Sequence, residues 1–525
     1  MTGIGSLIRL MLRRDRVLMP LWAVVLGLVP AGYVASIDSL FPTAVERAQY
    51  ARISAGNAGF VALYGPLHGS SLGELVAWRA GFLPVMAGLF ALLTVIRHTR
   101  TDEEAGRSEL IGAAAVGRQA QLAAALITTC AAGLVLGGVL FLAMIGQDLP
   151  VGGSLAFGAE MALVAWVFAG IGGVAAQLTS GARNARSIAI VALGVAYVLR
   201  VGGDISALGD GTLAWLSWLS PIGWVHHIFP YGANAWWPAL LTVLATLAAA
   251  AAAVWLLGRR DLGAGLLPAR LGRATAAAGL RSPLALAWRL HRGLLLGWTV
   301  GFALLGLVFG AVAGSIVDLA GENSGLGEMF ARLGGTTQLV DSYFASVAGI
   351  VGLVAACYAV QATLRLRDEE QSGHAEAVLG TAVSRYAWAG SHLVFSLLGP
   401  AVVLLAEGLV SGLLYPDGNL GEIVGGTLAQ LPAVWVLAAI AVFLTGLLPR
   451  LSLASWGAPA ICLLMLLVGP ILRLDQWVLD LSPFTHVPHL PGGAVTPTPL
   501  IALTVVAAVL GGVGVAGLRR RNIPD

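Results

Sequence analysis

The chain has 525 residues, of which 58% are hydrophobic and only 11% are charged. A soluble domain needs more charged side chains to cover its surface, so this composition excludes an ordinary soluble protein and indicates a chain embedded in lipid. All 30 basic residues are arginine, and the net charge is +3. Because a Walker A motif requires a lysine that contacts the nucleotide phosphates, the chain is excluded as an ATPase of that kind.

Apolar runs long enough to cross a bilayer as helices recur along the whole chain. We predict an all-α polytopic membrane protein with about twelve transmembrane helices, divided evenly between two halves. The first half contains the runs 17–36, 79–97, 120–145, 153–177, 186–202 and 236–257. The second half contains the runs 293–316, 344–365, 387–413, 424–448, 455–473 and 498–518.

The arginines are distributed unevenly between the predicted loops. Cytoplasmic loops of membrane proteins are enriched in basic residues, and most of the arginines fall in cytoplasmic segments if the N-terminus lies inside. The opposite loops are acidic and contain Asp38, Asp148 and Asp204, among others. We therefore predict a multi-pass protein of the bacterial inner (plasma) membrane with both termini in the cytoplasm.

Four stretches outside the apolar runs have distinctive patterns. Leucine or tryptophan alternates with arginine at helical spacing in 5–16 and 282–292, which predicts helices lying in the inner headgroup layer. The alternative is that these stretches simply extend the membrane-crossing helices. The long outer stretches 37–78 and 317–343 are expected to form short helices packed over the outer mouth.

The second half of the sequence repeats the first. The segments 100–118 and 367–385 align without a gap and are identical at seven of nineteen positions, where chance would give about two. A Leu-Ser-Pro turn precedes the last run of each half, and an arginine pair follows it, at Arg259-Arg260 and Arg520-Arg521. Because each half begins and ends inside, the repeats are parallel, and a substrate pathway between them is expected. The predicted domains are 1–257 and 291–525, joined by a cytoplasmic linker with an interfacial helix at 258–290.

Each copy of the repeated motif lies between the second and third apolar runs of its half. Two glutamates and the glycine between them are spaced three residues apart, so they would share one face of a helix, and the glycine would let another backbone approach. A solvated charged turn explains either copy alone, but two matched copies favour a docking surface used twice. The predicted docking residues are Arg100, Glu103, Gly106, Glu109, Arg118, Arg367, Glu370, Gly373, Glu376 and Arg385.

The pattern Arg-x-x-Glu-x-x-Gly-x-x-Glu, followed by small apolar residues and Val383-Ser384-Arg385, resembles the coupling loop of type-2 ABC exporter permeases. The fused two-half layout is similar to actinobacterial exporters of polyketide antibiotics. The resemblance implies that both loops form coupling helices that contact two copies of an ABC ATPase subunit, which would bind ATP and Mg. The first copy departs from the pattern at Gly117, and the second at Gln371 and His374, so the two loops need not be equivalent.

Few other residues suggest chemistry. Glu160 and Glu407 lie inside predicted membrane helices, where an ionisable side chain indicates either substrate or ion passage or a hydrogen bond between helices. The three cysteines fall in apolar runs and are expected to be core residues. His226 and His227 are adjacent, which is a poor arrangement for a metal pair. We predict no catalytic residue, no metal, no cofactor in this chain and no nucleic-acid partner.

These observations favour a permease subunit, not an enzyme, that exports lipophilic small molecules such as antibiotics or drugs. The alternative is a secondary transporter of the 6+6 helix kind driven by an ion gradient, which would require more buried charge than Glu160 and Glu407 provide. A membrane-embedded enzyme would require a cluster of polar catalytic groups at one depth, which the sequence does not show.

Overall fold

The structure is a computed structural model that describes residues 2–209, 211–267, 275–322, 335–415, 419–472, 475–494 and 496–520. Every regular element in these ranges is helical, as the predicted all-α class requires. The chain divides into two compact units, Met1–Gly272 and Arg273–Asp525. The boundary falls inside the stretch 258–290. Each unit is described by itself.

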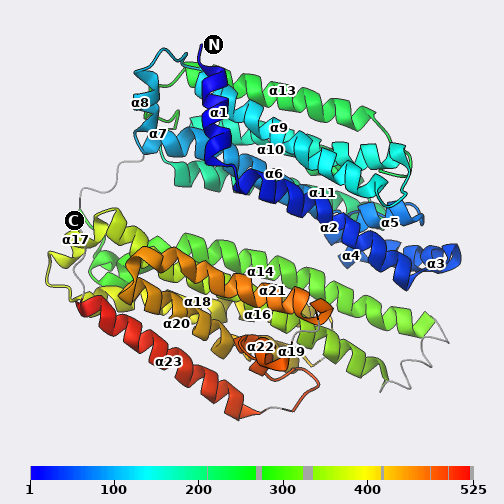
Figure 1. The fold of residues 1–525 in the computed structure, drawn as a ribbon. Helices are drawn as coiled ribbons and strands as arrows, with labels where there is room; N and C mark the ends of the chain where they lie inside the picture. The colour runs from blue at the N-terminus through cyan, green and yellow to red at the C-terminus, as the bar shows by residue number, and fades with distance from the viewer. Residues whose placement is uncertain are drawn as a thin grey trace. The chain divides into compact units, whose positions relative to one another are not determined.

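The helices of the first unit follow in chain order (Figure 1). They are α1 (Ile4–Arg14), α2 (Leu18–Leu40), α3 (Ala44–Ala55), α4 (Ala58–Tyr64), α5 (Leu72–Arg79), α6 (Leu83–Ile96), the π-helical turn η1 (Arg97–Thr101), α7 (Asp102–Glu104), α8 (Arg107–Gly112), α9 (Ala120–Ile145), α10 (Val151–Leu178), α11 (Ala182–Leu208), η2 (Ala214–Leu219), α12 (Pro221–His226) and α13 (Trp237–Gly258).

The second unit is also built from long helices joined by short ones. They are η3 (Ala278–Leu280), α14 (Pro283–Glu322), α16 (Gly335–Gln371), α17 (His374–Leu379), α18 (Arg385–Leu413), α19 (Leu420–Leu428), α20 (Leu431–Leu447), η4 (Pro449–Trp456), α21 (Gly457–Leu472), α22 (Gln476–Leu479), η5 (Pro483–His486) and α23 (Pro497–Arg520).

The membrane-crossing helices agree with the predicted runs. Among the described residues, 11 segments are long and apolar enough to cross a membrane, and the bent pair Leu72–Arg79 and Leu83–Glu104 brings the number to 12. Each of them overlaps one predicted run. The pair is bent by 46°. The bend lies at Gly81, where a Cβ atom would overlap the carbonyl oxygen of Tyr64, so a close approach of α4 holds the chain there.

Small residues let the long helices pack closely within each unit. In the first unit α10 lies between α6, α9, α11 and α13, and most of its side chains are buried. Gly137 of α9 and Gly158 of α10 face each other so closely that a Cβ atom on either would overlap the opposite carbonyl oxygen. In the second unit α14 packs on α18, and α20 on α23. Such small-residue contacts are typical of helices that associate in lipid, where van der Waals packing replaces the hydrophobic effect.

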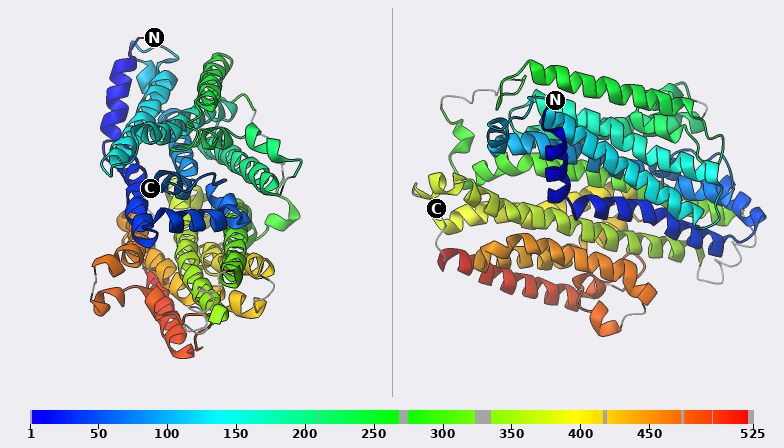
Figure 2. Two further views of the ribbon diagram at one scale, coloured as in Figure 1. Left: turned by 90° about the vertical axis from the view of Figure 1, so that its right-hand side faces the viewer. Right: turned by 45° about the horizontal axis from the view of Figure 1, so that its top comes forward.

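The two stretches predicted as interfacial helices differ. The stretch 5–16 corresponds to the separate helix α1, which runs across the long helices of its unit (Figures 1 and 2). Leu7 and Met11 of α1 are buried against the start of α9, while Arg9 and Arg13 are exposed. The prediction for 282–292 is wrong, because these residues form the first turns of the continuous helix α14. A turn at 15–17 separates α1 from α2, but no such turn follows 283–292. This stretch therefore extends the membrane-crossing helix, which was the alternative prediction.

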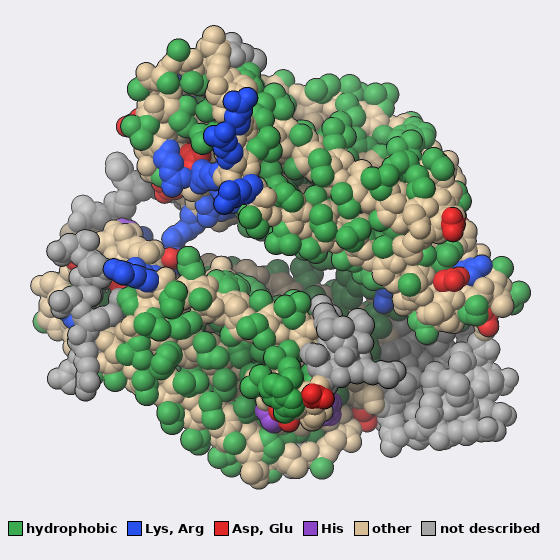
Figure 3. Space-filling model, viewed as in Figure 1, with side chains coloured by type: hydrophobic (Ala, Val, Ile, Leu, Met, Phe, Trp, Pro, Cys, Tyr) green, Lys and Arg blue, Asp and Glu red, His purple; other side chains and the backbone are tan. Residues whose placement is uncertain are grey.

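The predicted outer stretch 37–78 forms the short helices α3, α4 and α5 after the end of α2. The other one, 317–343, lies partly outside the described residues, as do Arg521 and the middle of the linker. Basic side chains gather at the end of the first unit that carries the N-terminus, and hydrophobic side chains cover the flanks of its helices (Figure 3). This distribution suits helix flanks in lipid and one charged end in water.

Candidate functional site

The two copies of the repeated loop share a left-handed glycine followed by a short helix. In the first, α7 ends at Glu104 and α8 begins directly after Gly106, whose φ is +72°. In the second, α16 ends at Gln371 and α17 begins directly after Gly373, whose φ is +71°. Glycine is favoured at both positions because the left-handed region is costly for residues with a side chain. Each loop therefore consists of a helix end, a glycine hinge and a short helix.

The predicted continuous helix through each glycine is wrong, because the left-handed residue breaks it. A Cβ atom at Gly106 or Gly373 would have no described atom of this chain within 4 Å. The approach of another protein's backbone to either glycine therefore stays a prediction. The glutamates before and after each glycine consequently point into different surroundings.

The first glutamate of each loop is buried, and the second is exposed. The side chain of Glu103 is 8% exposed and that of Glu370 is 1% exposed, and each is paired with the arginine three residues earlier. Glu109 and Glu376 lie in the first turns of α8 and α17 and face solvent. The sequence repeat thus extends to burial as well as to conformation.

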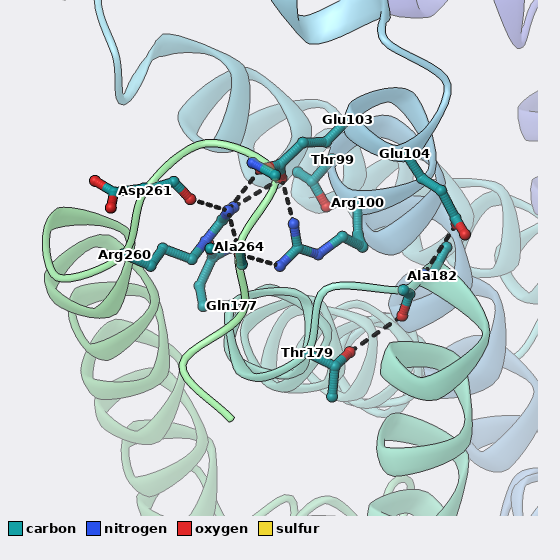
Figure 4. A network of polar contacts seen from close by, with 12 residues as sticks. Thr99, Arg100, Glu103, Glu104, Gln177, Thr179, Ala182, Arg260, Asp261 and Ala264 are labelled. Carbon is teal, nitrogen blue, oxygen red and sulfur yellow. Dashed lines mark hydrogen bonds and ion pairs between the residues drawn. The ribbon is translucent and has the colours of Figure 1, made fainter. Parts of the chain in front are cut away.

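Glu103 is the centre of a polar network in the first unit (Figure 4). Its carboxylate accepts bonds from both terminal nitrogens of Arg260 at 2.6 and 2.8 Å, and it lies 2.9 Å from Nη1 of Arg100. Arg260 also donates through Nε to Gln177 Oε1 at 2.7 Å. Two-point contacts between a guanidinium and a carboxylate fix geometry as well as charge. They tie the loop to the ends of α10 and α13.

The chain after α13 is fastened to the same loop. Arg100 is fully buried and donates to the carbonyl oxygen of Ala264 at 2.7 Å. The backbone N–H of Gly263 donates to Glu103 at 2.6 Å. Arg118 donates to the carbonyl oxygens of Leu257, at 3.1 Å, and of Arg260. Both predicted arginines of the first loop therefore hold backbone carbonyl groups.

Acidic neighbours of Glu103 connect the loop to α1 and α11. Asp102 accepts two bonds from Arg14 at 2.7 and 2.9 Å and one from Arg107 at 2.8 Å. Glu104 accepts the backbone N–H of Ala182 at 3.0 Å, which satisfies a free donor at the start of α11 (Figure 4). The loop is thus linked to α1, α10, α11 and the chain after α13 at one end of the first unit.

The second loop is held by its own set of contacts. Arg367 donates to Glu370 at 3.3 Å, and Arg365 pairs with Glu369 at 2.7 Å. Ser384 caps α18 by accepting the N–H of Ala387 at 3.2 Å. The first copy has Gly117 in the corresponding position, and α9 begins without a side-chain cap. The two loops therefore differ where their sequences depart from each other.

The exposed part of each short helix is what another protein could contact. Glu109 and Leu110 project from α8, and Leu110 is 78% exposed. Glu376 and Ala377 are exposed in the corresponding places on α17, and Arg385 is exposed at the end of the second loop. The described residues contain no group of three or more His, Cys, Asp or Glu side chains that could hold a metal ion. A carboxylate beside an apolar side chain suits docking and offers no reaction chemistry.

The network also contains residues that sequence reasoning did not single out as site residues, namely Asp102, Glu104, Gln177 and Arg260. The arginine pair that follows the last run of each half was a usable signal for Arg260. Its burial against Glu103, 157 positions away, was not visible in the sequence. Long-range pairing of this kind depends on how the helices pack.

The two acidic residues inside the membrane helices lie apart from the loops. Glu407 on α18 is fully buried, and the hydroxyl oxygen of Ser411 lies 2.9 Å from its carboxyl group and 3.1 Å from the carbonyl oxygen of Gly306 on α14, so the single O–H can donate to either one. The contact of Glu407 with Ser411 lies within α18, and only Ser411 reaches α14, so this contact is not the predicted hydrogen bond between helices. Glu160 on α10 is also buried, but it lines a cavity. A role of either residue in substrate passage stays a prediction.

Comparison with known proteins decides the family. The chain is 41% identical over 529 aligned residues to the multidrug efflux system permease protein Rv1217c of Mycobacterium tuberculosis, covering 99% of this chain and 95% of that protein. The chain belongs to this family of multidrug efflux permeases. The family model of the Rv1217c permease C-terminal domain also matches residues 280–519. The similarity to exporter permeases predicted from the two loops is thereby confirmed, and the permease is a multi-pass membrane protein.

Proposed function

We propose that this chain is the membrane-spanning subunit of an ATP-driven exporter of lipophilic small molecules, such as drugs or antibiotics, and that separate ATPase subunits drive it through α8 and α17. The efflux activity is supported by the close relationship to a multidrug efflux permease. The need for a separate ATPase is supported by the absence of lysine, and hence of a Walker A motif, from the chain.

One observation carries the proposed coupling role: two loops, 267 positions apart in the repeat, keep the same glycine conformation, the same buried glutamate and the same exposed glutamate. A solvated turn does not need its first glutamate buried under an arginine. A docking helix does, because force applied to the exposed residues reaches the membrane helices only if the loop is fastened to them.

Two loops suit two copies of one ATPase subunit, each holding ATP and Mg. The proposed orientation places both termini and both loops in the cytoplasm. It is supported within each unit, because α8 packs near α1 at the N-terminal end, and α17 packs near Leu518 at the end of α23. Each loop therefore lies at the end of its unit where the chain begins or finishes.

Charge reversal of the two exposed glutamates tests the proposal. The double variant Glu109→Arg/Glu376→Arg, purified with its ATPase and placed in proteoliposomes, is expected to lose ATP-dependent transport by at least about tenfold, because a complementary charged contact becomes repulsive. Asp38→Arg is the matched control. Asp38 is an exposed carboxylate at the far end of α2, and its reversal should leave transport unchanged.

Two outcomes would count against the proposal. Unchanged transport by the double variant would remove the docking role of α8 and α17. Transport that persists without ATP but collapses with a protonophore would identify an ion gradient as the energy source, which is the alternative left open by the buried carboxylates of Glu160 and Glu407.

A further inference from the structure

The first unit contains a cavity of ≈ 330 Å³ at the end opposite the coupling loop. Its lining comes from α4, α5, α10, α12 and the segment after α12. The lining includes the exposed His68 and the buried Trp78 and Glu160. The cavity therefore runs from the surface of the unit into the core between its helices. A volume of this size falls in the range of small-molecule sites, which is about 300–1,000 Å³.

Glu160 is the unusual member of this lining. It is only 4% exposed, yet among the described residues its carboxylate has no hydrogen bond. The nearest titratable partner is His226, whose Nε2 lies 3.7 Å from Oε1 of Glu160 and itself lacks a hydrogen-bond partner. Burying a carboxylate without a charged partner is costly, and Glu160 lines the cavity, so a ligand that brings a positive charge would stabilise it.

His226 does not supply the positive charge that Glu160 lacks. Burial, together with the positive charge of Arg200, holds the pKa of His226 well below its ordinary value, so the imidazole is neutral at physiological pH. A neutral imidazole adds no positive charge beside the carboxyl group of Glu160. Glu74, a second lining carboxylate, uses one oxygen to cap α5 at the backbone of Ser71. The polar part of the cavity selects for positive charge.

The arginines nearby are already engaged. Arg200 is fully buried and donates to the carbonyl oxygens of Val61 and Ala62 at 3.0 and 2.8 Å. Arg79 lies over the ring of Tyr64, with Cζ 4.8 Å from the ring centroid. Neither arginine lines the cavity. Glu160 is consequently the main acidic group without a charged partner that a ligand would meet, and a bound cation would favour its ionised form.

The apolar walls are aromatic, and one of them is held in a costly backbone conformation. Trp78 and Phe229 line the cavity beside Tyr64. Phe229 and Tyr231 have φ values of +50° and +63°, in the left-handed region that bulky residues avoid. Such conformations cluster at ligand sites, where the surrounding structure maintains them. Aromatic faces also attract cations through the ring quadrupole.

We propose that this cavity is a binding site for hydrophobic organic cations, with Glu160 as the counter-charge and Trp78 and Phe229 as the aromatic walls. The cation replaces the missing partner of Glu160, and its apolar groups replace water against the rings. A role of this binding site in export rests on the proposed function. Binding of the cation itself requires neither ATP nor the ATPase.

Binding of radiolabelled tetraphenylphosphonium to the full chain in nanodiscs tests this site. The expected result is saturable binding that weakens at least about tenfold in Glu160→Gln, because a partly buried charge pair is worth several kcal/mol. Phe229→Leu should weaken binding about threefold or more through loss of the aromatic face. Asp38→Asn, which removes an exposed carboxylate that does not line the cavity, should bind like the parent chain.

The anion tetraphenylborate, which has the same shape with the opposite charge, serves as the ligand control. The proposal is overturned if tetraphenylborate competes as well as the cation, or if Glu160→Gln binds the cation with unchanged affinity while melting at the parent temperature. If Glu160→Gln does not fold, unchanged cation binding by Phe229→Leu overturns it. Cation binding without ATP-driven transport would leave this site standing and remove only the exporter function.

Discussion

The two glutamates of each loop differ in burial and in their contacts. Glu103 joins Arg100 and Arg260 inside the first unit, and Glu370 joins Arg367 inside the second. Glu109, in contrast, is exposed in the first turn of α8, where a carboxylate also complements the positive end of the helix dipole. Removal of the inner glutamate should therefore affect the fold, and removal of the outer one should affect only contact with a partner.

Stability measurements on a matched pair test this division. Glu103→Gln leaves Arg100 and Arg260 partly unpaired in a buried place, and we expect it to cost about 3 kcal/mol of stability. Glu109→Gln changes an exposed side chain and should alter stability by less than about 0.5 kcal/mol. Thermal melting of the two purified variants gives the comparison. Equal melting temperatures would show that the network around Glu103 does not support the unit.

At the scale of the element, the glycine hinge sets the direction of each short helix. Both hinges lie in the left-handed region, at φ +72° and +71°, and have open space around them. The apolar runs predicted the membrane helices well, because length and hydropathy alone decide them. The hinge was not predicted, because the spacing of glutamate and glycine fits a continuous helix equally well. The two predicted interfacial helices also show what the sequence does not reveal. Their arginine patterns are similar, yet α1 is a separate helix whereas 283–292 continue into the membrane helix α14.

Alanine substitution tests the hinge. Gly106→Ala places a side chain in the left-handed region and should cost the loop about 1–2 kcal/mol. Gly112→Ala, at the end of α8, also adds a methyl group into open space but needs no unusual φ. Hydrogen exchange should therefore speed up in residues 104–112 of the first variant only. Faster exchange in both would mean that the added methyl group, and not the backbone conformation, disturbs the loop.

At the scale of the molecule, the chain carries two similar short helices, α8 and α17, which we propose as docking helices, and it has no Walker A motif. The first loop is bonded to α1, α10, α11 and the chain after α13, so under the proposed coupling a movement of α8 would reach most of the first unit. The repeat made this doubling predictable from sequence. The contacts that fasten each loop depend on side chains brought together from distant positions, and only the folded chain shows them.

Photo-crosslinking to the ATPase tests the two-dock account most directly. A photoreactive residue at Leu110 on α8 and, separately, at Ala377 on α17 should capture the same kind of ATPase subunit, because both side chains are exposed beside the outer glutamates. The same residue at Val45 on α3, which is 75% exposed at the other end of the first unit, should capture none. Absence of the ATPase from both loop positions, or labelling of the two loops from opposite sides of the membrane, would contradict the account.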